Sequence, residues 1–174
     1  MIQRPNTLLL ADAGPLITLA YAGALDLLFK PGWQVKLVDM VLHEVTRNQT
    51  PTSQAIKSWA SQHQLEILPT KTFEHYKQAL SAGTLSRKSN LGELAIQETM
   101  NTLAISSQNS TGVFLFEDHK IARASFLLPD NCRKVSTRAF LLFLERQEWI
   151  KSAAEIERQA VLKGRQFSEL KFPP

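Results

Sequence analysis

Four acidic residues, Asp12, Glu44, Glu93 and Asp118, could together hold a divalent cation. Four carboxylates crowded at one site repel one another, and a divalent cation is the usual way to neutralise them. Oxygen ligands without a cysteine or a histidine pair favour Mg²⁺ or Mn²⁺ over zinc. Such an ion can activate a water molecule and stabilise charge on a phosphoryl oxygen during an in-line displacement. This chemistry requires a fold that brings the four residues together.

Asp12 and Asp118 each follow an apolar run, at residues 8–11 and 113–116, that is typical of a buried strand. The carboxyl ends of parallel strands meet at one edge of a sheet, so we expect both carboxylates at that edge. In open α/β sheets, ligands bind outside the carboxyl ends of the strands. Both residues therefore stand where chemistry is expected.

Glu93 and Glu44 are predicted to lie on helices that reach the same edge. Glu93 shares a helical stripe with Ile96 and Met100 and stands in the first turn of its helix. Glu44 follows the second predicted strand by about one and a half helical turns and shares a face with Val41. An acid on an apolar stripe is costly unless something compensates its charge. The four positions together therefore favour a metal site.

Each acid also has an ordinary structural interpretation. Asp12 and Asp118 could be N-caps of the helices that follow them. Glu93 stands three residues after Asn90, which is close to a capping-box spacing. Glu44 could be a solvated helical residue. Each acid taken singly favours the structural role, and the ordered set of four favours the functional one.

The hydrophobic pattern predicts strands that alternate with helices along the whole chain. Such alternation indicates an α/β fold, a three-layer α/β/α arrangement in which a mostly parallel sheet is covered on both faces. We expect strands at residues 8–11, 35–38, 65–68, 113–116 and 134–136. We expect helices at residues 15–29 (interrupted at Gly23), 40–47, 51–62, 73–80, 91–105, 121–125, 140–144 and 153–162.

Composition points to one globular domain. The 174 residues are 44% hydrophobic, and no apolar run approaches the roughly 18 residues that cross a membrane. No signal peptide is visible, and the single Cys132 excludes an internal disulfide framework and a cysteine-based zinc site. We therefore expect a cytoplasmic, reduced protein. The net charge of +4 permits nucleic-acid binding but is only a weak indication of it.

The motifs around the four acids resemble those of PIN domains, in particular the ribonuclease toxins of the virulence-associated protein C type. The matching stretches are LLLADAGPLITL around Asp12, VDMVLHEV around Glu44, LGELAIQE around Glu93 and VFLFEDHKIAR around Asp118. Their order and spacing suit that family over residues 1–150. The chain departs from the family pattern at Glu93, where many members carry Asp, and at Ala13, where a small hydroxyl residue is frequent.

The resemblance implies a PIN-like α/β/α sandwich in which the four acids hold one or two Mg²⁺ or Mn²⁺ ions for hydrolysis of RNA phosphodiester bonds. It also implies a toxin neutralised by a cognate antitoxin protein, and a possible homodimer. On this basis residues 1–150 form the nuclease domain. Residues 151–174 form a C-terminal helix and tail that packs on the same domain or on a partner.

Several further residues are candidates for substrate contacts or for structural roles. Thr137, after the last predicted strand, could hydrogen-bond a metal-bound water or a phosphate, or act as a simple cap. We expect Glu117 to point to the opposite side of its strand from Asp118 and to face solvent. We expect Asp39 to be a helix cap. Residues that could contact RNA phosphates are Arg87, Lys88, Lys120 and Arg123.

Two other functions stay open at this point. The chain could be a catalytically inactive PIN-like module that binds RNA or a protein partner. A phosphotransfer enzyme or a response-regulator-like domain is less favoured. The sequence has no phosphate-binding glycine loop of the G-x-x-x-x-G-K-[S/T] or G-x-G-x-x-G kind, and no pair of acids after the first strand.

Overall fold

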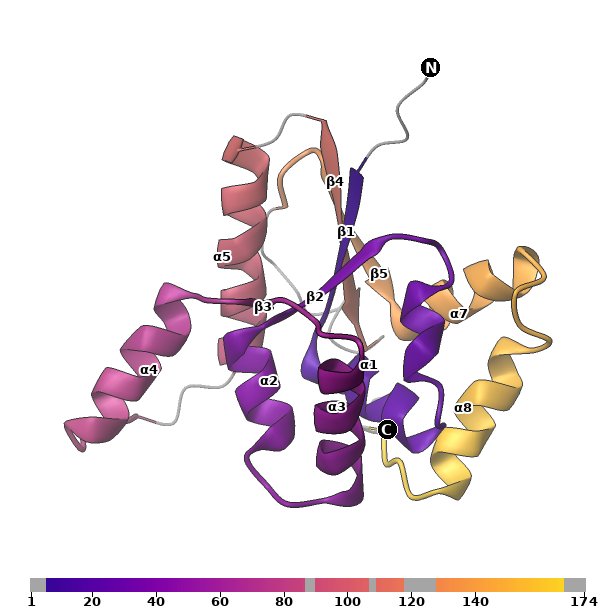
Figure 1. Cartoon of the computed structure of the whole chain (residues 1–174), viewed down its shortest axis with the longest axis horizontal. Helices are drawn as coiled ribbons and strands as arrows, with labels where there is room; N and C mark the ends of the chain where they lie inside the picture. The colour runs from indigo at the N-terminus through magenta and orange to yellow at the C-terminus, as the bar shows by residue number, and fades with distance from the viewer. Residues whose placement is uncertain (1–5, 87–89, 107–108, 118–127, 168–174) are drawn as a thin grey trace, which may run out of the picture.

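The computed structural model describes residues 6–86, 90–106, 109–117 and 128–167. Its centre is a five-stranded sheet in which every paired strand is parallel to its neighbour, in the order β3-β2-β1-β4-β5 (Figure 1). The strands are β1 (Asn6–Ala11), β2 (Gln34–Val38), β3 (Ile67–Leu68), β4 (Ser110–Phe116) and β5 (Cys132–Ser136).

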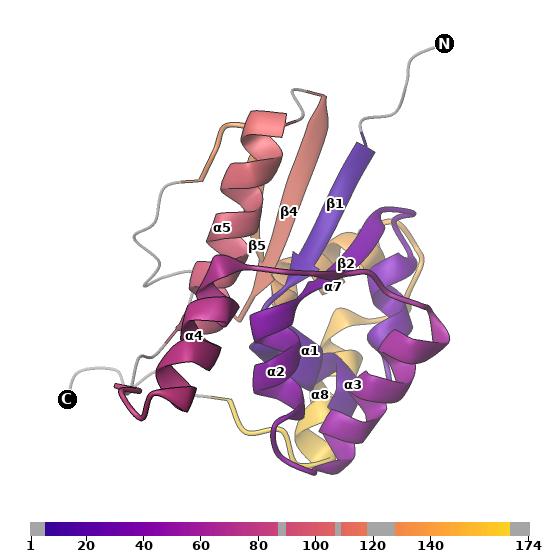
Figure 2. The same ribbon diagram turned by 60° about the vertical axis from the view of Figure 1, so that its left-hand side comes forward.

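Helices cover both faces of this sheet. Figures 1 and 2 show α5 on one side of β1 and β4, with α1, α7 and α8 on the other side. The described helices are α1 (Ala13–Tyr21), α2 (Asp39–Thr46), α3 (Pro51–Gln62), α4 (Lys71–Ser81), α5 (Leu91–Ser106), α7 (Thr137–Arg146) and α8 (Ala153–Leu162), with a 3₁₀ helix η1 (Leu25–Phe29). The three-layer α/β/α fold predicted from the sequence is confirmed.

Side chains that alternate along β4 contact the two layers of helices in turn. Gly112 lies against Met100 of α5, whereas Glu117, five residues on, accepts a hydrogen bond from Thr18 of α1. Side chains an odd number of positions apart in a strand point to opposite faces. The central strands are therefore buried on both sides, and Leu9, Leu10, Phe114 and Leu115 have no exposed surface.

Most predicted elements are confirmed, with differences that have local causes. The predicted helix 15–29 is two elements, because α1 ends at Tyr21 and Gly23 turns the chain with a φ of +65°. The strand expected at residues 113–116 begins three residues earlier, at Ser110. The helix expected at residues 121–125 lies outside the described residues.

The C-terminal helix packs on the rest of the fold. Helix α8 lies against α1 and α7, and Ala153 and Ala160 on its inner face are buried. Beyond α8, Arg165 reaches back to α1. No helix in the described ranges is long and apolar enough to cross a membrane.

Candidate functional site

Asp12 lies at the point where the sheet changes its direction of winding. The chain leaves β1 toward β2 and later returns to the other side of β1 as β4, so the carboxyl ends of β1 and β4 form the topological switch point. Asp12 directly follows β1, and its N–H donates to the Leu115 carbonyl of β4 at 2.9 Å. Its side chain has no exposed surface. The buried carboxyl group is thus fixed where α/β sheets bind ligands.

The alternative role of Asp12 as a helix cap is not made in the structure. Asp12 occupies the N-cap position of α1, yet its carboxylate accepts no hydrogen bond from the first turn, which the structure describes throughout. An N-cap side chain bonds to the second or third N–H of its helix, and the third residue here is Pro15, which has none. Capping therefore gives no reason for an acid at this position.

Glu44 and Glu93, the Glu44–Glu93 pair, both lie at the start of α5. The N–H of Gly92 donates to the Glu44 carboxylate at 3.1 Å, and Glu93 is the next residue along the helix. A Cβ at position 92 would stand 2.7 Å from Oε2 of Glu44, so only glycine leaves room for the carboxylate. The positive end of the helix dipole favours an anion in this place. Both glutamates are partly exposed.

The described acids of the predicted set lie in two places. Asp12 is at the carboxyl end of β1, and Glu44 and Glu93 are at the start of α5. Helix α2, which carries Glu44, packs against both α1 and α5. No three Asp, Glu, His or Cys side chains within the described ranges are arranged so that they could hold a metal ion. The fourth predicted ligand, Asp118, lies outside those ranges. The donors that are described, carboxylate oxygens at the carboxyl end of β1 and at a helix start, have the chemistry that Mg²⁺ and Mn²⁺ prefer.

The residues predicted to contact substrate are mostly outside the described part of the chain. This applies to Arg87, Lys88, Lys120 and Arg123. Thr137 is described and is only 3% exposed, and its hydroxyl donates to the Phe116 carbonyl at 3.2 Å. Ser136 caps α7 by accepting a hydrogen bond from the Ala139 N–H at 3.0 Å. Thr137 thus directs its hydroxyl into the fold.

Glu117 corrects an expectation from the sequence. It was expected to face solvent, but it is only 4% exposed and lies on the side of β4 that faces α1. Thr18 donates to its Oε1 at 2.8 Å, and the Arg165 guanidinium lies 3.6 Å from the same oxygen. Sequence spacing gave no signal for this contact, because the cation comes from a segment 48 residues further on.

Two other acids hold helices together. Asp39, expected as a helix cap, accepts from its neighbour Met40 at 2.7 Å and also from the N–H and hydroxyl of Thr70 at 2.8 and 2.7 Å. Glu98 of α5 accepts from the first N–H groups of α4, those of Lys71 at 2.7 Å and Thr72 at 3.1 Å. Both carboxylates therefore serve α4, and neither joins the Glu44–Glu93 pair.

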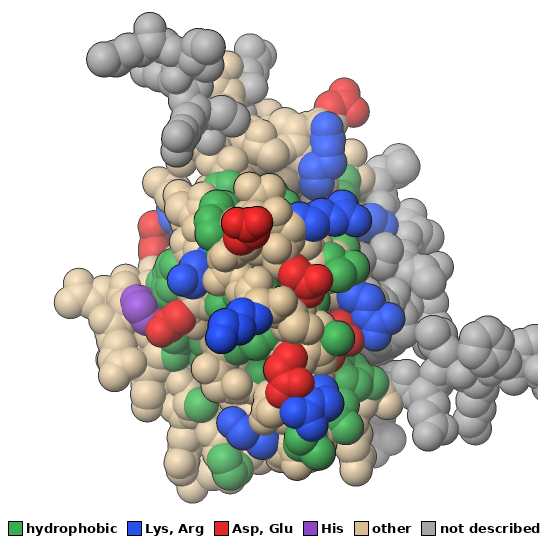
Figure 3. Space-filling model, turned by 90° about the vertical axis from the view of Figure 1, so that its right-hand side faces the viewer, with side chains coloured by type: hydrophobic (Ala, Val, Ile, Leu, Met, Phe, Trp, Pro, Cys, Tyr) green, Lys and Arg blue, Asp and Glu red, His purple; other side chains and the backbone are tan. Residues whose placement is uncertain are grey.

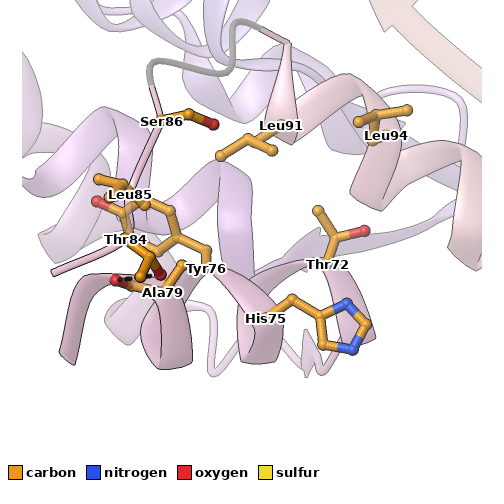
Figure 4. Close-up of a pocket in the computed structure, with 9 residues that line it drawn as sticks. All are labelled: Thr72, His75, Tyr76, Ala79, Thr84, Leu85, Ser86, Leu91 and Leu94. Carbon is orange, nitrogen blue, oxygen red and sulfur yellow. Dashed lines mark hydrogen bonds between the residues drawn. The ribbon is translucent and has the colours of Figure 1, made fainter. Parts of the chain in front are cut away.

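A pocket of about 270 Å³ opens between α4 and the start of α5. Figure 4 shows Thr72 and Tyr76 of α4 facing Leu91 and Leu94 of α5, which flank Glu93 in the sequence. The Tyr76 hydroxyl lies 3.4 Å from Nε2 of His43. Burial, together with the nearby charge of Arg47, lowers the pKa of His43. An imidazole with a lowered pKa and a partly apolar pocket with hydroxyl groups therefore adjoin the Glu44–Glu93 pair.

The face of the molecule formed by α7 and α8 has charges of both signs. Figure 3 shows basic and acidic side chains interspersed over this face. Two exposed ion pairs account for part of the pattern, Arg138 with Glu157 at 3.0 Å and Arg158 with Glu155 at 2.7 Å. Exposed pairs of this kind contribute little to stability, and mixed signs do not make a phosphate-binding surface.

Comparison of the chain with protein-family models, with curated proteins and with solved structures gave no match.

Proposed function

We propose that this protein is a divalent-metal-dependent ribonuclease of the PIN type, which hydrolyses RNA phosphodiester bonds. The observation that carries the proposal is the buried Asp12 at the switch point of the sheet. A carboxylate without exposed surface is costly unless it is compensated, and capping of α1 does not explain it. Glu44 of α2 and Glu93 at the start of α5 supply further oxygen donors, on two helices that pack against each other.

In this proposal Asp12, Glu44, Glu93 and Asp118 hold Mg²⁺ or Mn²⁺. When bound, such an ion supplies an activated water and stabilises charge on a phosphoryl oxygen. The Gly92 N–H orients the Glu44 carboxylate, and the β4 carbonyl of Leu115 fixes the backbone of Asp12. Arg87, Lys88, Lys120 and Arg123 position the RNA phosphates. The cellular role proposed is that of a cytoplasmic toxin with a cognate antitoxin, active as a monomer or a homodimer.

The test is cleavage of single-stranded RNA by the purified protein in Mn²⁺ or Mg²⁺, with EDTA as the control. We expect cleavage that requires the metal and returns when metal is added back. A second substrate set of single-stranded DNA determines whether the activity is specific for RNA. Equal cleavage with and without EDTA would contradict the proposal, because the activity would then not depend on a metal ion.

A second candidate is a catalytically inactive module that binds RNA or a protein partner. It is favoured by one observation, namely that no group of three acids within the described ranges could hold a metal. This alternative expects RNA to bind equally well in EDTA and in Mn²⁺, with no cleavage in either. It also expects Asp12→Asn to bind RNA as the wild type does.

A further inference from the structure

A largely buried ion pair joins the end of β4 to the segment that follows α8. The side chains of Glu117 and Arg165 are 6% and 16% exposed, and their charged atoms lie 3.6 Å apart. Thr18 of α1 connects them a second time, since it accepts from Nε of Arg165 and donates to Oε1 of Glu117, both at 2.8 Å. Residues far apart in sequence thus meet in one network of two hydrogen bonds and an ion pair.

This network lies beside the carboxyl ends of β1 and β4, where the proposed site is. Glu117 is the first residue after β4 and precedes Asp118 in the sequence. Its side chain lies so close to Gly14, two residues after Asp12, that a Cβ at position 14 would overlap Cγ of Glu117. The same Oε1 lies 3.4 Å from the hydroxyl of Thr137, the first residue of α7. The Glu117 carboxylate, at the end of β4, therefore contacts the starts of both α1 and α7.

The segment after α8 is shaped to bring its cation to this place. Gly164 has a φ of +110°, a conformation that L side chains rarely adopt, and it turns the chain back toward α1. The N–H of Arg165 donates to the Ala160 carbonyl at 2.9 Å, which fixes the turn on the last residues of α8. The guanidinium lies 5.0 Å from the ring centroid of Phe167.

A buried ion pair of this kind is weak evidence for stability, because desolvating both charges offsets most of their attraction. We propose that Arg165 is a positioning residue, which acts through Glu117 to hold the carboxyl ends of β1 and β4 in register for catalysis. This inference rests on the proposed ribonuclease function. On this proposal residues 163–167 contribute to catalysis, although they approach the sheet from the face opposite α5.

The experiment compares Arg165→Met with Arg158→Met, which removes an equal charge from an exposed pair on α8. Hydrogen–deuterium exchange is followed at the Asp12 amide, whose bond to Leu115 joins the two strand ends. We expect faster exchange around residues 11–16 in Arg165→Met and wild-type exchange in Arg158→Met. Faster exchange confined to residues 153–167 would overturn the proposal, because Arg165 would then only anchor its own segment.

Steady-state RNA cleavage supplies the second readout. Displacement of catalytic groups by about 1 Å can cost about 10²-fold in rate, so we expect kcat of Arg165→Met to fall by about that factor with KM little changed. Arg165→Lys should restore part of kcat, since the charge is kept and the bond to Thr18 is weakened. An unchanged kcat in folded Arg165→Met would also overturn the proposal.

Two further comparisons keep the result decisive. If Arg165→Met does not fold, Glu117→Gln replaces it, because the amide keeps the shape of the carboxylate and removes the charge. The same exchange pattern is then expected at residues 11–16. A wild type that never cleaves RNA contradicts the proposed function alone, since the exchange measurements still decide whether Arg165 controls the two strand ends.

Discussion

At the scale of single residues, Pro15 decides between two roles of Asp12, helix capping and ligand binding. An aspartate before a helix is ordinarily a cap, but Pro15 removes the N–H that the third helical position would offer. The carboxyl group is nevertheless fully buried at the switch point. The pattern Asp-Ala-Gly-Pro therefore combines a helix start with an acid that capping does not use.

Gly92 offers a test at this scale, because its missing side chain is the space that Glu44 occupies. In Gly92→Ala the new Cβ would lie 2.7 Å from Glu44 Oε2 and 3.2 Å from Cγ2 of Val41. The carboxylate is the end of a flexible side chain, so we expect it to shift away. We expect RNA cleavage to fall by roughly tenfold or more, as on removal of a group that supports a metal ligand. The free energy of unfolding should change by less than about 1 kcal/mol.

The matched control is Thr102→Ala on the exposed side of the same helix, which should leave cleavage unchanged. Normal cleavage by a folded Gly92→Ala protein would mean that the position of Glu44 against α5 has no part in catalysis.

The sequence predicted which acids end apolar runs, and the structure places Asp12 accordingly. It did not predict the burial of Glu117, because a buried acid and a surface acid look alike in a strand pattern. The difference depends on Arg165 and Thr18, which no local spacing connects to β4. A carboxylate that one distant cation compensates is therefore identified only in three dimensions.

At the scale of elements, α4 depends on acids from its neighbours. Every residue of α4, which the structure describes throughout, is at least partly exposed. Glu98 of α5 accepts from its first N–H groups, and Asp39 of α2 binds its N-cap Thr70. The position of α4, and with it one wall of the pocket beside Glu93, is thus fixed by charged hydrogen bonds together with the packing of the half-buried Phe73 and Tyr76 against the core.

The attachment of α4 should therefore weaken in acid. Burial alone would raise the pKa of Glu98, but the N–H groups of Lys71 and Thr72, the Thr72 hydroxyl and the Lys71 charge together lower it below 4.5. A carboxyl group with a lowered pKa in the folded state contributes stability above its unfolded pKa. That stability is lost as pH falls through the folded pKa. Glu98→Gln should thus cost about 1 kcal/mol near pH 7 and less near pH 3.

Urea unfolding of wild type and Glu98→Gln at both pH values measures this difference. Glu74→Gln, an exposed acid in the first turn of α4, is the control and should unfold like the wild type at both. An equal loss of stability at the two pH values would show that the Glu98 charge does not anchor α4.

Element boundaries were predictable where the chain carries local signals. Helix α3 spans residues 51–62 as expected, because Thr50 and Ser53 form a capping box and Pro51 begins the helix. The start of β4 was missed because Ser110, Thr111 and Gly112 are typical of a loop. Gly112 nevertheless belongs to the strand, where it pairs with Leu8. A glycine is needed there because Met100 of α5 occupies the place where a Cβ would lie.

At the scale of the whole molecule, alternation of strands and helices was sufficient to predict a parallel sheet covered on both faces. The order β3-β2-β1-β4-β5 was not predicted, because it depends on which strand returns beside β1. That order decides the functional argument. It places the ends of β1 and β4 next to each other, so that Asp12 lies at a switch point and not at a sheet edge.

If the switch point binds a metal, the whole fold should be stabilised by it. Mn²⁺ at 100 times its Kd would add about 2.7 kcal/mol, which corresponds to a rise in Tm of about 5–10 °C for a domain of this size. We expect this rise for the wild type, and no rise for Asp12→Asn. An equal shift in both proteins, measured by thermal unfolding, would place the bound ion elsewhere.

The first measurement to make is the single-turnover rate of RNA cleavage in Mn²⁺ by wild type, Asp12→Asn and Asp130→Asn. Asp130 is exposed, so Asp130→Asn makes the same chemical change outside the site. We predict wild-type cleavage by Asp130→Asn and a loss of at least about 10²-fold by Asp12→Asn, whose Tm in the absence of metal stays the same or rises as carboxylate repulsion falls. Cleavage by folded Asp12→Asn at the wild-type rate would contradict the metal-dependent site at the switch point.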